Sequence, residues 1–292
     1  MQFKRILSLC LCSVLLLGIA GCDAKQNTKT EGSGKITGGS AEKPKTQKTS
    51  EGSGTPEEAE TVEKPETIEI PQGDKYIAFT FDDGPTGNTD GRTERLLDGL
   101  KERGVHATFF LCGYRVRDFN SMMNRYLAEG HEVGNHTMDH IRLDTQTNDG
   151  GYAQVSSNND LIASYTGQAP TLMRPVGGAY NDDVIASMKK LGMPIILWNI
   201  DTLDWKYHDD AAVIQQRILD RARDGAIVLE HDLYEATLEG VLAAIDELQA
   251  QGYAFVTVSE LAKIKGITLE PGKVYTGFTP DDTVVESGSN FS

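Results

Sequence analysis

The sequence predicts an α/β protein whose parallel strands form a closed or nearly closed barrel. From residue 75 onward, short β-prone runs alternate with segments of helical character. This alternation implies parallel strands that are joined through helical crossovers. The seven runs are 76–81, 107–111, 132–135, 171–174, 195–198, 226–229 and 254–258.

Three of the intervening segments have a clear helical pattern, at 93–103, 209–223 and 238–251. In the second, apolar residues recur at three- and four-residue spacings, which places them on one face of a helix. The third ends at Gly252, a residue type that commonly terminates helices. An open doubly wound sheet is the alternative, but no glycine-rich phosphate loop follows the first run, which disfavours it.

Residues 1–22 are predicted to be a secretory signal. Lys4 and Arg5 precede an apolar run at 6–19 that is shorter than the roughly 20 residues of a membrane span. The run ends in a segment, 17–22, that resembles the bacterial lipoprotein signal, in which the cysteine becomes the lipidated first residue. The resemblance implies an exported protein that Cys22 anchors to the membrane on its extracytoplasmic side. The alternative is an ordinary signal peptide that happens to contain a cysteine.

The composition divides the rest of the chain into three parts. Residues 23–72 are a flexible, low-complexity linker, because almost no apolar side chains are available there to offset conformational entropy. Residues 73–265 form the folded domain, and 266–292 form a C-terminal tail that packs at first and ends loosely. Cys112 is the domain's one cysteine, so we expect a fold without disulfides.

The charge balance excludes one class of partner. The chain has 43 acidic and 28 basic side chains, a net charge of −15. Since a surface of this sign repels phosphate backbones, we expect no binding to nucleic acid. We expect the protein to be a monomer.

Polar residues gather where the predicted strands end. In a parallel barrel these ends open on one face, so side chains far apart in sequence converge there. The polar segments are 82–85, 136–140, 174–175, 201–205 and 229–232. Five such segments in succession predict a functional site.

Two histidines within this set, His136 and His140, have a spacing that suits chelation of one metal ion. A carboxylate from another strand would complete the ligand set. A chance spacing of surface histidines and simple turn chemistry at Asp82 and Asp83 are the alternatives.

The motifs resemble those of the polysaccharide deacetylases with a NodB-type (chitooligosaccharide deacetylase) homology domain, carbohydrate esterase family 4. The resemblance covers residues 74–262, with five motifs in the family's order at 80–84, 136–140, 174–178, 201–205 and 229–231. The third motif departs from the family because Val176 replaces the usual second proline, which puts substrate fit in question. The resemblance implies a deformed (β/α)7 barrel, similar to a TIM barrel.

The resemblance also implies a role for each motif residue. The metal ligands are Asp83, His136 and His140, with zinc as the usual ion and cobalt or a similar ion possible. The general base is Asp82, held by Arg174, and the general acid is His231, paired with Asp204. The substrate-binding residues are Trp205 and Leu229 at the acetyl pocket, Gly177 through its backbone N–H, and Tyr180. Tyr207 and His208 follow Trp205 on the same loop and are further candidates for contact with sugar.

These residues predict a metal-dependent hydrolase that removes N-acetyl groups from N-acetylglucosamine units of an extracellular glycan. Peptidoglycan is the expected substrate because the lipid anchor places the enzyme beside the wall, and chitooligosaccharide is another N-acetylated candidate. Two alternatives remain, an O-acetyl esterase on acetylxylan or a related polymer, and a catalytically inactive glycan-binding lipoprotein.

Overall fold

The computed structural model describes residues 69–87, 91–147 and 149–282. The predicted signal, Cys22 and the linker up to residue 68 lie outside these residues, so the predictions about export, lipidation and the linker are not tested by the structure. None of the helices in the described part of the chain is both long and apolar enough to cross a bilayer.

A parallel sheet with the strand order β3-β2-β1-β6-β5 is the centre of the fold, and a further strand, β7, pairs with the first three residues of β1. The strands are β1 (Lys75–Asp82), β2 (Thr108–Leu111), β3 (Glu132–Asn135), β5 (Ile200–Asp201), β6 (Ile227–His231) and β7 (Tyr253–Phe255). Because β2 and β6 flank β1 in parallel register, their carboxyl ends lie beside the end of β1.

Short and irregular pairings continue the barrel wall from β3 to β4. Asn135 at the end of β3 bridges to Met173, and Met173 bridges to Ile195 of β4 (Ile195–Ile196). The chain then runs directly from β4 into β5, which pairs with β6. The deformed α/β barrel predicted from the sequence is therefore confirmed.

Three details differ from the sequence prediction. The run 171–174 forms only the isolated bridges of Met173, and the run 195–198 ends as a strand at Ile196. Pro175 has no N–H with which to continue the ladder from Met173 to Ile196, and the Arg174 side chain donates instead to the carbonyls of Ile196 and Leu197. A further strand, β8 (Val274–Tyr275), comes from the segment expected to be a tail and pairs with β4.

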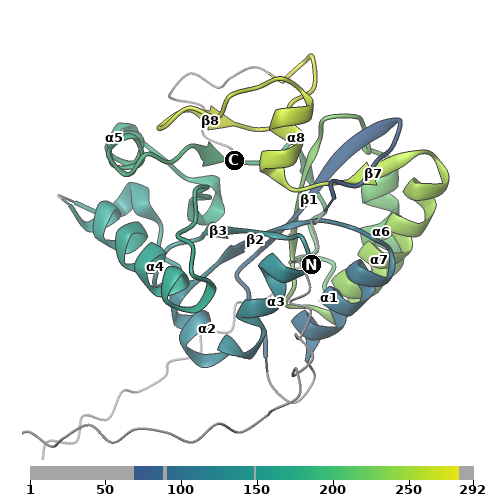
Figure 1. The fold of residues 1–292 in the computed structure, drawn as a ribbon, viewed down its shortest axis with the longest axis horizontal. Coiled ribbons are helices and arrows are strands. Elements are labelled where there is room, and N and C mark those ends of the chain that lie inside the picture. Colours follow the sequence, from purple (N-terminus) through teal and green to yellow (C-terminus); the bar gives the residue numbers. More distant parts are fainter. Residues whose placement is uncertain (1–68, 88–90, 148, 283–292) are drawn as a thin grey trace, which may run out of the picture. The chain divides into compact units, whose positions relative to one another are not determined.

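Helices cover the barrel in two groups (Figure 1). One group contains α1 (Arg92–Glu102), α6 (Ala211–Leu219) and α7 (Glu235–Ala250), which correspond to the three predicted helices. The other contains α2 (Gly113–Asp118), α3 (Met123–Ala128), α4 (Gly150–Thr166) and α5 (Asp182–Leu191). The helix α8 (Val258–Ile264) follows β7, and three short 3-10 turns are η1 (Asn120–Met122), η2 (Leu143–Thr145) and η3 (Val176–Gly178).

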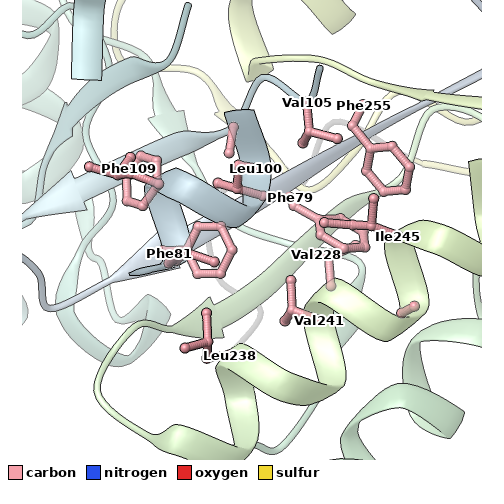
Figure 2. Packing of buried hydrophobic residues seen from close by; sticks show 14 of the residues in the cluster. Phe79, Phe81, Leu100, Val105, Phe109, Val228, Leu238, Val241, Ile245 and Phe255 are labelled. Carbon is pink, nitrogen blue, oxygen red and sulfur yellow. The ribbon is translucent and has the colours of Figure 1, made fainter. Parts of the chain in front are cut away.

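The main hydrophobic core packs β1 against the first group of helices (Figure 2) and extends to residues of α2, α3 and α4. Phe79 and Phe81 are fully buried there, and Phe81 stacks on Phe109 with ring centroids 5.1 Å apart. Side chains of a strand alternate between its faces, so Thr80 and Asp82 point to the other side, into the barrel. The apolar alternation of β1 therefore fixes the direction in which Asp82 faces.

Candidate active site

The carboxyl ends of the strands surround one cavity of about 380 Å³. It is lined by Asp82, Asp83, His136, His140, Val176, Gly177, Trp198, Asp201, Trp205, Leu229 and His231. Each of the five predicted motifs therefore contributes at least one residue to the cavity lining. Arg174 and Asp204, which also belong to these motifs, lie directly behind the lining.

Arg174 is fully buried and fixes Asp82 in the wall of the cavity. Its Nη1 lies 2.8 Å from Asp82 Oδ1 and 2.7 Å from Thr80 Oγ1. The guanidinium also lies over the ring of Phe110, 4.2 Å from its centroid. The ion pair therefore fixes the position of the Asp82 carboxylate and occupies its Oδ1.

Three side chains in the cavity can hold a metal ion, namely Asp83, His136 and His140, whose candidate ligand atoms all lie within 4.8 Å of one another. Asp83 Oδ1 is 2.9 Å from His140 Nε2 and 3.4 Å from His136 Nε2. This oxygen is nevertheless buried without a well-aligned hydrogen bond. Atoms that approach closely without bonding to one another suit a cation placed between them, so the donor set fits a divalent metal.

The second nitrogen of His136 supports the same conclusion. Its Nδ1 lies 2.7 Å from the carbonyl oxygen of Arg174 and donates to it. This bond fixes the tautomer and leaves the Nε2 lone pair directed at Asp83, as is usual for metal-binding histidines.

The backbone at the metal set is held in an unusual conformation. Asp83 has φ 69° and His140 has φ 51°, both in the left-handed region that residues other than glycine rarely adopt. Strain of this kind is typical of functional sites, where the surrounding structure imposes it. It turns both side chains towards His136.

The charges around Asp83 favour its ionised form. Burial alone would raise the pKa of Asp83, but the imidazoles of His136 and His140 lower that pKa below its usual value. The carboxylate is therefore charged across the whole physiological range and available as a ligand.

On the far side of the set, His231 is held by Asp204. Its Nδ1 donates to Asp204 Oδ1 at 2.8 Å, and its backbone N–H donates to Asp204 Oδ2 at 2.6 Å. Burial opposes the charged imidazolium, but the bond to Asp204 prevails and raises the pKa of His231 to about 9. At neutral pH His231 is therefore protonated, with Nε2 free of Asp204.

The predicted substrate-binding residues divide into two groups. Trp205, Leu229 and Gly177 line the cavity, and Gly177 has φ 64°, which favours glycine at this position. Val176, the departure from the third motif, also lines it. Tyr180 does not line the cavity: its side chain packs against the cluster around Met173 and α5, because it follows the turn that carries the motif.

Three contributors were missed from the sequence. Trp198 lines the cavity and lies 5.5 Å from the Arg174 guanidinium, while Thr80 shares Nη1 of Arg174 with Asp82. Thr237 donates to Asp204 Oδ2 at 2.9 Å. No local signal marks Thr237, which reaches the site from α7, whereas Thr80 is the first residue of the motif at 80–84 and alternates with the apolar residues of β1.

Comparison with known proteins gives the family that the sequence motifs resemble. A sequence model of the polysaccharide deacetylase family matches residues 69–196. The peptidoglycan-N-acetylglucosamine deacetylase PgdA of Listeria monocytogenes is 41% identical over 201 residues, which are 69% of this chain and 41% of PgdA. The peptidoglycan-N-acetylmuramic acid deacetylase PdaC of Bacillus subtilis is 39% identical over 191 residues, 65% of this chain and 39% of PdaC.

Solved structures agree with the sequence matches. The PdaC structure is 38% identical with a TM-score of 0.62, covering 66% of this chain and 92% of that one. A family 4 acetyl xylan esterase from Clostridium thermocellum, in complex with a cobalt ion, is 29% identical with a TM-score of 0.64, covering 70% and 98%. The chain therefore belongs to the polysaccharide deacetylase family, carbohydrate esterase family 4. It spans about two fifths of the length of PgdA and PdaC.

Proposed function

We propose that the protein uses this cavity to hydrolyse the N-acetyl groups on N-acetylglucosamine units of an extracellular glycan, with peptidoglycan as the substrate. One observation carries the proposal: a paired carboxylate, a three-residue metal set and a protonated histidine surround a single cavity. Amide hydrolysis needs these three groups, because water must be activated, charge on the carbonyl oxygen stabilised and the amine protonated.

Asp83, His136 and His140 would hold a divalent metal ion, for which we propose zinc, with cobalt as an alternative. When bound, such an ion supplies Lewis-acid polarisation of a carbonyl and lowers the pKa of water from 15.7 towards ~7. The relative that was solved with cobalt supports a divalent ion at this kind of site.

Asp82 would act as the general base. Arg174 fixes Oδ1, while Oδ2 lies 3.7 Å from His136 Nε2 and so faces the metal set. Asp82 therefore takes a proton from the attacking water through the oxygen that Arg174 leaves free. The backbone N–H of Gly177, at the cavity wall, would donate to the carbonyl oxygen as it gains charge.

His231 would act as the general acid. Because Asp204 binds Nδ1, the proton on Nε2 is the one available to the departing amine. One proton of the water goes to Asp82 and one proton from His231 goes to the amine, so the products are the free amine and acetic acid, which then loses its proton to solvent as acetate.

An O-acetyl esterase is the second candidate, since the acetyl xylan esterase has the same fold. The raised pKa of His231 favours the amide, because a nitrogen leaving group requires full protonation whereas an alcohol requires less. We further propose that the enzyme is exported and anchored through Cys22, with the linker allowing it to reach the cell wall.

The test measures acetate released by the metal-loaded protein from peptidoglycan, chitooligosaccharides and acetylxylan. We expect release from the first two, its loss after chelation and its return with added zinc or cobalt. Asp139→Asn is a matched control: Asp139 lies between the two histidines but is hydrogen-bonded to Gln154. Release from acetylxylan alone would favour the esterase, and no release from any substrate would contradict both.

A further inference from the structure

A pair of aromatic rings stands beside the cavity. The rings of His208 and Tyr234 have centroids 5.7 Å apart and planes inclined by 35°. His208 is exposed on the loop that follows Trp205, and Tyr234 is half-buried at the start of α7, three residues after His231. Two loops from different strands of the barrel thus meet in one aromatic surface.

Each ring lies three residues along its loop from a residue that lines the cavity, Trp205 in one loop and His231 in the other. Trp205 lines the cavity, yet its side chain is 51% exposed, so it extends from the cavity to the outside. Tyr207, by contrast, packs against the main core and does not contribute its ring.

The chemistry of these rings suits a sugar. A pyranose has a flat face of C–H groups that stacks on aromatic rings, and the polar tips of tyrosine and histidine can bond to its hydroxyls. Rings that hold one another in place lose little conformational freedom on binding. In a glycan strand, further sugar units flank the unit whose acetyl group enters the cavity.

We propose that His208 and Tyr234 form a stacking platform that binds a neighbouring sugar unit of the same glycan strand. The proposal rests on the proposed function, which supplies the polymer. The platform makes the enzyme favour longer strands, because binding energy from the distant unit holds the reacting unit in position.

The experiment compares N-acetylglucosamine oligomers of two and five units with the metal-loaded wild type and the variants His208→Ala, Tyr234→Ala and Tyr234→Phe. The measured quantity is the ratio of kcat/KM for the five-unit to the two-unit substrate. We expect this ratio to fall by about tenfold in the alanine variants, the effect of losing one good aromatic contact. Tyr234→Phe, which keeps the aromatic ring, should have a ratio close to that of the wild type.

Tyr165→Ala serves as the control, since Tyr165 is an exposed tyrosine near the end of α4 and does not line the cavity. An unchanged ratio in both alanine variants would overturn the platform. Calorimetric binding of the five-unit oligomer, measured in parallel, separates the two proposals. If the wild type binds the five-unit oligomer but releases no acetate, the proposed function fails. In that case weaker binding of the oligomer by Tyr234→Ala than by the wild type still supports the platform, and equal binding overturns it.

Discussion

Arg174 Nη1 lies 2.8 Å from Asp82 Oδ1, and both side chains are buried within the barrel. The adjacent Asp83 has no such partner and instead faces His136 and His140. Two neighbouring carboxylates therefore have different surroundings, since successive residues at the end of β1 turn to different sides. This difference is the basis for assigning one to proton transfer and the other to the metal.

Removal of Arg174 should destabilise the domain strongly. Arg174→Met leaves Asp82 charged and unpaired in the interior, which typically costs about 3–5 kcal/mol in the free energy of unfolding. Denaturant unfolding of the metal-free domain measures it. In an Asp82→Asn background, Arg174→Met should lower the free energy of unfolding by less. An equal loss in both backgrounds would show that Arg174 does not stabilise the domain through its ion pair with Asp82.

The pH dependence should report on His231. Its pKa of about 9 in the folded protein exceeds the ordinary value of about 6.5. The pairing with Asp204 therefore stabilises the fold fully below about pH 6.5, and this contribution is lost as the pH rises through about 9. NMR titration of the metal-free protein should show this pKa.

Asp204→Asn should lower that pKa and move the alkaline limb of kcat/KM to lower pH. The reason is that the asparagine keeps a hydrogen-bonding side chain but removes the negative charge. A profile identical to that of the wild type would show that His231 is not the acid or that Asp204 does not tune it.

The metal set predicts how metal content responds to mutation. His136→Ala should reduce bound zinc, measured by elemental analysis after dialysis, by at least tenfold, because one of three protein ligands is lost. Asp139→Asn should keep the wild-type content, since Asp139 turns away towards Gln154. Full metal content in His136→Ala would place the ion elsewhere.

Much of this architecture could be predicted from the sequence because it depends on local patterns. The alternation of β1 and the helical period of 209–223 are visible in the residues themselves. The run 171–174 was predicted as a strand but forms only bridges, because Pro175 has no N–H to continue the pairing and the buried Arg174 side chain takes the carbonyls of the neighbouring segment. The proline is visible in the sequence next to the run, whereas the bonds of the Arg174 side chain are tertiary and have no signal there.

The candidate site, too, could be predicted only where it depends on local patterns in the sequence. Motif residues at strand ends could be named from the sequence, since parallel strands bring their carboxyl ends together. Thr237 and the His208–Tyr234 pair could not be placed, because their positions depend on how α7 begins and how two loops meet. Tyr180 adjoins a motif but is partly buried against the hydrophobic cluster that includes residues of α5, a position that depends on packing and not on the motif.

The most direct test of the account is Asp82→Asn, with metal content and acetate release measured on the same preparation. We predict that zinc content stays at the wild-type level while the rate of acetate release falls by about 10²–10⁴-fold, as expected for loss of a general base. Near-normal turnover would contradict the assignment of Asp82 as the base. Loss of the metal along with activity would contradict the division of roles between Asp82 and Asp83.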